Sequence, residues 1–146
     1  MMKVSEKGLE LIRSFEGCRL TAYKCQAGRW TIGYGHTGKE VVEGLQITQT
    51  RATDFLLLDV NQVLKMLRTE LRVPVRQCQL DALVSLGFNI GVDALRKSTL
   101  MRLVNRNPDD LNIQGEFNRW VYVKGVVSNG LVRRRAAEAK LYFSEK

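Results

Sequence analysis

Residues 16–36 read Glu-Gly-Cys-Arg-Leu-Thr-Ala-Tyr-Lys-Cys-Gln-Ala-Gly-Arg-Trp-Thr-Ile-Gly-Tyr-Gly-His, and the hydrophobic pattern changes within this stretch. From residue 30 on, large apolar side chains alternate with threonine and glycine, which is typical of a strand with an open second face. Residues 22–25 provide a partner strand, joined through residues 26–28. The stretch therefore predicts a small β-hairpin.

Three side chains of this stretch are candidates for chemistry. A hairpin loop centred on Gly28 is expected to place Cys25 and Thr31 directly opposite each other on the open face. Glu16 follows a helix predicted for residues 5–15, where the negative end of the helix dipole disfavours an ionised carboxylate. A protonated carboxyl is what a general acid requires.

The rest of the chain is predicted to be helical. An apolar stripe with Thr48 as N-cap indicates a helix over residues 48–72, about 37 Å long, which is more than a small lobe needs. Shorter helices are expected over 77–89, 98–105, 111–122 and 132–144. The prediction is a single α+β, mostly helical domain, residues 1–146. Its small hairpin-containing N-terminal lobe (14–58) is joined by the connecting helix (48–72) to an all-helical C-terminal lobe (73–146 plus the N-terminal helix).

The composition narrows the function classes. The 146 residues include 23 basic and 15 acidic side chains, a net charge of +8, which favours a polyanionic partner such as nucleic acid, an anionic membrane or an acidic cell-wall polymer. Apolar runs such as residues 55–58 stay far below the ~20 residues of a membrane span, and the first residues lack the apolar segment of a signal peptide. Three cysteines without a CxxC pair argue against a disulfide framework and against a zinc site.

The candidate residues also have a recognisable spacing. Glu16, Cys25 and Thr31 follow Glu-x8-Cys-x5-Thr, and Thr31 opens the string Thr-Ile-Gly-Tyr-Gly-His. This pattern resembles the phage-type lysozymes, the endolysins of glycoside hydrolase family 24, whose motif is Glu-x8-[Asp or Cys]-x5-Thr within T-x-G-x-G-H. The resemblance continues through residues 88–91, 98–100, 119–120 and 133–135. The lysozyme-like fold of that family agrees with the architecture predicted from periodicity.

The resemblance implies an N-acetylmuramidase that hydrolyses the β-1,4 bond between N-acetylmuramic acid and N-acetylglucosamine in peptidoglycan. It implies that Glu16 is the general acid, and that Thr31 and the residue at position 25 hold the attacking water, with inversion at the anomeric carbon. The commoner residue at position 25 is Asp. Cys25 departs from that pattern, because a free thiol is mostly neutral at pH 7.

Other roles also follow from the resemblance. Phe88, Asn89 and Ser98 are the expected substrate-binding residues, with helix packing or capping as the alternative for each. His36 is the one histidine of the chain, and it is expected to form a structural ion pair with Asp59. The resemblance implies no cofactor and no metal.

Peptidoglycan is the implied partner. With no membrane anchor, the protein is expected to accumulate in the host cytoplasm until a separate pore-forming holin releases it to the cell wall, and to be a monomer. No nucleic-acid partner is expected, because Arg133, Arg134 and Arg135 at a helix start, with Glu138 after them, are interpreted as a solvated face.

Two alternatives remain open. A lytic transglycosylase cleaves the same bond with one Glu and no water, which would leave Cys25 and Thr31 without a role. A non-catalytic basic module that binds the cell wall or nucleic acid fits the charge of residues 73–146, where 12 basic and 7 acidic side chains lie. Products released from purified peptidoglycan distinguish these alternatives from a lysozyme.

Overall fold

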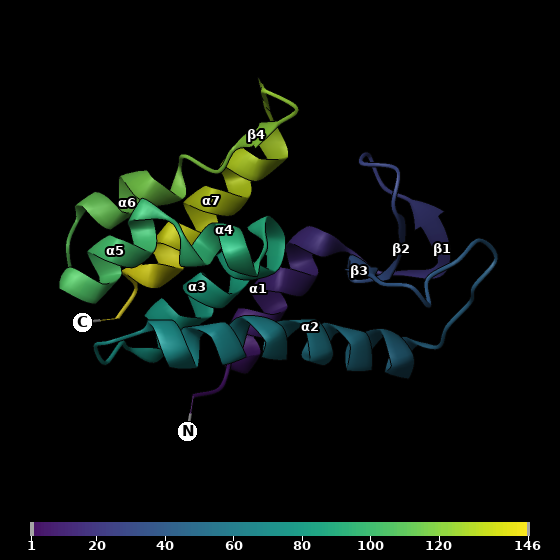
Figure 1. Ribbon diagram of the computed structural model, residues 1–146, viewed down its shortest axis with the longest axis horizontal. Coiled ribbons are helices and arrows are strands. Elements are labelled where there is room, and N and C mark those ends of the chain that lie inside the picture. Colours follow the sequence, from purple (N-terminus) through teal and green to yellow (C-terminus); the bar gives the residue numbers. More distant parts are fainter. Residues whose placement is uncertain (1, 146) are drawn as a thin grey trace. The chain divides into compact units, whose positions relative to one another are not determined.

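The structure, a computed structural model, describes residues 2–145 and divides into two compact units (Figure 1). The smaller unit consists of residues 10–61. The larger one combines residues up to Leu9 with those from Gln62 on. Both boundaries fall inside helices, α1 (Glu6–Glu16) and α2 (Gln49–Glu70), so each of these helices belongs in part to both units.

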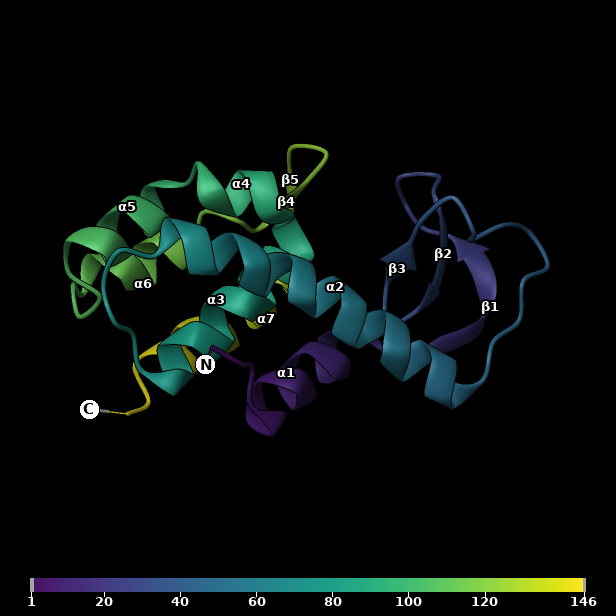
Figure 2. The same cartoon turned by 60° about the horizontal axis from the view of Figure 1, so that its bottom comes forward.

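The smaller unit contains a three-stranded antiparallel sheet. Its strands are β1 (Arg19–Lys24), β2 (Trp30–Gly33) and β3 (His36–Thr37), in that order (Figure 2). Its core consists of the buried side chains Ile32, Val41 and Phe55, so strand β2, the loop after β3 and helix α2 pack together. The predicted hairpin is present, with β3 as an additional strand.

The register of the hairpin differs from the prediction. Cys25 N–H donates to the Arg29 carbonyl at 2.9 Å, and Thr31 pairs with Tyr23 rather than with Cys25. The loop is therefore residues 26–28, centred one residue earlier than expected, because Gly28 has a φ of 80° and closes a three-residue turn. Cys25 and Thr31 consequently lie on the same face of the sheet as diagonal neighbours, not as a direct pair.

The helix ends follow ordinary capping chemistry. Ser5 Oγ accepts from the Gly8 N–H at 3.3 Å at the start of α1, and Gly17, with a φ of 66°, ends that helix. Thr48 Oγ1 accepts from the Arg51 N–H at 3.1 Å and caps α2 as predicted. The apolar side chains of α2 are buried apart from Leu57 and Leu58, which are 41% and 51% exposed, so the predicted apolar stripe faces the core over most of the helix.

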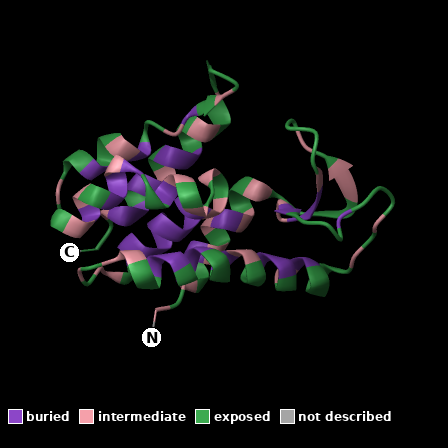
Figure 3. Ribbon diagram, in the orientation of Figure 1, coloured by how far each residue is buried: buried purple, intermediate pink, exposed green. Residues whose placement is uncertain are grey.

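The larger unit is built around helix α3 (Gln77–Ile90), whose residues from Cys78 to Gly87 are all buried (Figure 3). Helix α7 (Asn129–Tyr142) packs against α3. Helix α4 (Val92–Arg96) follows α3 directly in the chain. The remaining helices, α5 (Thr99–Arg106) and α6 (Asn112–Phe117), pack against each other. The fold is thus α+β and mostly helical, as predicted.

The prediction of an all-helical C-terminal lobe is wrong at one place. Helix α6 ends at Phe117, and residues 122–127 form a two-stranded hairpin of β4 (Tyr122–Val123) and β5 (Val126–Val127). Lys124 and Gly125 both have positive φ, which is the two-residue turn that suits a hairpin. Apolar β-branched and aromatic residues on either side of a Lys-Gly pair are a strand signal that outweighs the helical pattern.

Candidate active site

Glu16 is the last residue of α1, and its carboxylate lies against the backbone of Gly35. A Cβ atom on Gly35 would lie 2.9 Å from Glu16 Oε1, closer than real Cβ contacts allow. Gly35 also has a φ of 80°, a left-handed conformation that favours glycine. The second glycine of the Thr-Ile-Gly-Tyr-Gly-His string is therefore the residue that leaves room for this carboxylate.

Cys25 and Thr31 lie near the closed end of the same hairpin. The Thr31 side chain is buried and donates its hydroxyl hydrogen to the Arg29 carbonyl at 3.0 Å. Backbone hydrogen bonds from Arg29 and Ala27, and a contact from the Thr31 side chain, hold the pKa of the Cys25 thiol below its usual value. The thiol is therefore more easily ionised than a free cysteine, and it lies next to a hydroxyl that is held in place.

Tyr23 is a residue of this site that the sequence interpretation missed. It lies two residues before Cys25 on β1, opposite Thr31, and Arg19 lies over its ring at 4.6 Å. Partial burial, and then the nearby carboxylate of Glu16, raise the pKa of Tyr23. The alternation of a strand is the signal that could have found it, because residues 23 and 25 share one face.

His36 links strand β3 to helix α2. Its Nδ1 lies 2.8 Å from Asp59 Oδ2, and its Nε2 lies 2.6 Å from Glu40 Oε1. The ring stacks on Phe55 with centroids 4.0 Å apart. Asp59 is the expected partner, whereas Glu40, four residues after His36, was not expected. The hydrogen bond with His36 lowers the pKa of Glu40, while burial raises the pKa of Asp59.

The three expected substrate-binding residues all lie in the larger unit. Phe88 is half-buried and Asn89 is exposed at the end of α3. Ser98 is the N-cap of α5: its hydroxyl donates to the Leu95 carbonyl at 2.7 Å and accepts from the Met101 N–H at 3.1 Å. The capping alternative therefore describes what Ser98 does in this structure, although it also lines a cavity of about 440 Å³ beside Lys97 and Glu116.

The interpretation of the arginines on α7 as a solvated face is wrong for two of them. Arg134 is 3% exposed and Arg135 is fully buried. Arg134 Nε lies 3.2 Å from Glu138 Oε2, and Arg135 Nη1 lies 2.5 Å from Glu138 Oε1. Packing of α7 against α3 buries these charges, and the carboxylate one turn later compensates them.

Two features are absent from the described part of the chain. Within residues 2–145, no helix combines the length and the apolar character that crossing a membrane would demand. The same residues contain no group of three or more His, Cys, Asp or Glu side chains placed to hold a metal ion.

Comparison with known proteins finds similarity to phage lysozymes and endolysins. The family model described as "Phage lysozyme" matches residues 13–138. An endolysin of Acyrthosiphon pisum secondary endosymbiont phage 1 is 46% identical, over 98% of this chain and 99% of its own length. An endolysin of Bacillus phage PZA is 42% identical, but this chain spans only 56% of it. The solved structure of the endolysin from Escherichia coli O157:H7 phage FAHEc1 is 38% identical with a TM-score of 0.88, covering 97% of this chain and 94% of that one.

Proposed function

Since the chain belongs to the phage lysozyme family, we propose that Glu16, Cys25 and Thr31 are its catalytic residues and that it cleaves the β-1,4 bond after N-acetylmuramic acid. The protein is a glycoside hydrolase of the lysozyme class, an endolysin that acts on peptidoglycan. The whole chain, residues 1–146, works as one lysozyme domain, and its unit of residues 10–61 carries the three catalytic residues.

Glu16 acts as the general acid. The observation that carries this role is the position of its carboxylate against Gly35, where an added Cβ would lie 2.9 Å from Glu16 Oε1 and displace it. A general acid has to be held at one position relative to the glycosidic oxygen. The backbone of Gly35 limits the positions that the Glu16 carboxylate can take. Its proton passes to the leaving oxygen as the bond breaks.

Cys25 and Thr31 hold the attacking water on the other face of the sugar. The Thr31 hydroxyl is oriented by its bond to the Arg29 carbonyl, and the lowered pKa of Cys25 favours the thiolate, the form that accepts a proton from water. Attack by water rather than by a protein group gives the inverted, α product. Phe88, Asn89 and Ser98 are the residues proposed to contact the glycan.

The enzyme acts as a monomer. Its release depends on a holin, which lets it pass from the host cytoplasm to the wall. The support for this route is the cell-wall activity of the family together with the absence of a spanning helix within residues 2–145. Expression with and without a holin, followed by turbidity of the culture, tests it. Lysis without a holin would contradict the dependence.

Replacing Glu16 by Gln tests the catalytic assignment. The amide keeps the size and the hydrogen bonds of the carboxyl but has no proton to transfer, so release of reducing ends from purified peptidoglycan should fall by more than about 10²-fold. Glu10→Gln, an exposed position on the same helix, is the matched control and should keep full activity. Anhydro ends instead of reducing ends would indicate a transglycosylase, and neither product would indicate a binding module.

Variants at position 25 test the role of the thiol. Cys25→Asp should keep or raise activity, because it supplies a carboxylate that is ionised at pH 7, and Cys25→Ala should lose about 10²-fold. Iodoacetamide reacts with the thiolate, so inactivation should rise with pH around a lower midpoint than that of a free cysteine measured under the same conditions. Because Cys18 is exposed and Cys25 is half-buried, the alkylation is measured in a Cys18→Ser background. A Cys25→Ala variant as active as the parent would contradict the role.

A further inference from the structure

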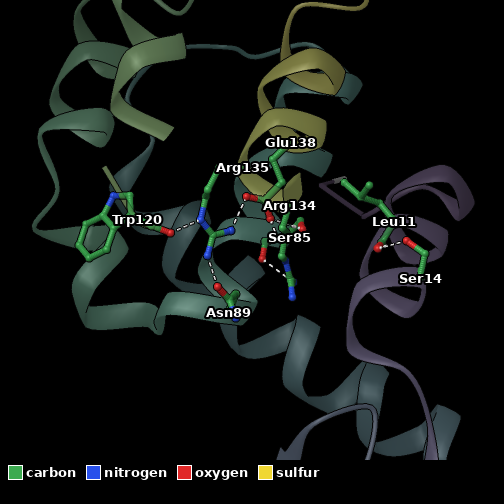
Figure 4. A network of polar contacts seen from close by, with 8 residues as sticks. All are labelled: Leu11, Ser14, Ser85, Asn89, Trp120, Arg134, Arg135 and Glu138. Carbon is green, nitrogen blue, oxygen red and sulfur yellow. Dashed lines mark hydrogen bonds and ion pairs between the residues drawn. The ribbon is translucent and has the colours of Figure 1, made fainter. Parts of the chain in front are cut away.

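The guanidinium of Arg135 forms hydrogen bonds with three segments of the larger unit (Figure 4). Its Nε donates to the backbone carbonyl of Trp120 at 2.8 Å, its Nη1 donates to Glu138 on α7 at 2.5 Å, and its Nη2 donates to Oδ1 of Asn89 at the end of α3. Arg135 and Glu138 are both fully buried, so water does not compete for the bond between them. The planar fork of an arginine can make all three contacts at once, and a lysine cannot.

The contact with Arg135 determines which way the Asn89 amide faces. A guanidinium has only donors, so the amide oxygen has to face it and the amide nitrogen has to point away. The side chain is exposed, and its nitrogen has no hydrogen-bond partner in the part of the chain from residue 2 to 145. Asn89 thus presents two N–H donors and no acceptor.

Asn89 also borders a cavity of about 540 Å³ in the larger unit. Its wall includes Asn89, Arg119, Trp120, Tyr122 and Arg135, and no acidic side chain contributes to it. Its size is that of an ordinary small-molecule site, and an indole ring provides a flat apolar surface. A wall of this composition suits a ligand group that accepts hydrogen bonds.

We propose that Arg135 is a positioning residue that turns the amide N–H groups of Asn89 into this cavity, where they bind a carbonyl or carboxylate oxygen of the substrate. The inference rests on the proposed function, because it takes peptidoglycan as that substrate. Peptidoglycan offers such oxygens on the acetamido groups of its sugars and on its stem peptides. Asn89 is therefore a hydrogen-bond donor to these oxygens. Arg135 makes it a donor by binding the amide oxygen, which leaves the N–H groups for the substrate.

The first test replaces Asn89 by Asp. The carboxylate still accepts from Arg135, so the fold and the buried network are kept, but both donors are lost. On soluble peptidoglycan fragments KM should rise about tenfold, the equivalent of one hydrogen bond, while kcat and the melting temperature stay near those of the parent. Asn112→Asp, an exposed asparagine on α6, is the matched control for the added charge and should change neither constant.

The second test is a double-mutant cycle with Arg135→Lys. In the parent, the single ammonium cannot replace all three guanidinium contacts, so Asn89 is held less firmly and KM should rise. In the Asn89→Asp background it should raise KM no further, because the donors are already gone. Equal effects in both backgrounds would mean that Arg135 acts only on stability. If Arg135→Lys does not fold, Asn89→Leu takes its place as a second variant without donors and should show the same KM rise as Asn89→Asp.

The substrate distinguishes the two sources of the oxygen. A rise in KM on peptide-free glycan fragments as well as on peptide-bearing ones assigns the acetamido carbonyl, and a rise on peptide-bearing fragments alone assigns the stem peptide. Unchanged KM on both for Asn89→Asp would overturn the inference. Because the parent is assayed for new reducing ends in the same experiment, failure of the proposed function appears separately, as a parent that releases none.

Discussion

Gly35 is the residue on which the position of the Glu16 carboxylate depends. Gly35→Ala should reduce hydrolysis by at least about tenfold, because the new methyl group would lie 2.9 Å from Glu16 Oε1 and push the carboxylate away from the bond that it protonates. The left-handed φ of 80° adds a stability loss of about 1–2 kcal/mol. Activity per folded molecule on purified peptidoglycan and the free energy of unfolding measure the two effects separately.

Gly44 provides the matched control for this variant. Its φ is 85°, and nothing lies within 4 Å of the position that a Cβ would take. Gly44→Ala should therefore lose the same stability as Gly35→Ala and keep its activity. If both variants hydrolyse peptidoglycan equally well, the fit of Glu16 against Gly35 has no part in catalysis.

At the scale of elements, strand β3 is fastened to helix α2 through His36. Replacing His36 by Ala removes the stacking on Phe55 and leaves the half-buried Asp59 without its partner. The free energy of unfolding in urea should fall by about 3 kcal/mol. Glu40→Gln should change it much less, since Glu40 is 53% exposed and an exposed ion pair contributes little. Equal losses for the two variants would place the stabilisation in the Glu40 contact instead.

At the scale of the whole molecule, the net charge of +8 favours the anionic cell wall. Ions shorten the reach of this attraction from ~10 Å at 0.1 M salt to ~3 Å at 1 M. The rate of lysis of intact walls should therefore fall several-fold over this range, whereas the rate on short soluble fragments should change little. Unfolding curves at both salt concentrations exclude a loss of the folded enzyme. A wall-lysis rate independent of salt would show that the charge has no part in binding.

Local patterns predicted much of the fold and only part of the site. Thr48 caps its helix as expected, because its bond from the Arg51 N–H joins residues only three apart. The hairpin of residues 122–127 was missed although its local signal was present. The register around Cys25 was wrong by one loop position, because the conformation of Gly28 decides which residues pair.

The sequence by itself determined most of the helices, the first hairpin and the spacing of Glu16, Cys25 and Thr31, since these depend on neighbours along the chain. Only the tertiary structure decided the contacts that shape the site. Gly35 receives Glu16 from another element, Glu40 completes the contacts of His36, and the buried Arg135 orients Asn89 from 46 residues away. The Gly35–Glu16 and Arg135–Asn89 contacts join segments that lie far apart in the sequence, so no local pattern predicts them, and the burial that strengthens them arises only when the elements pack.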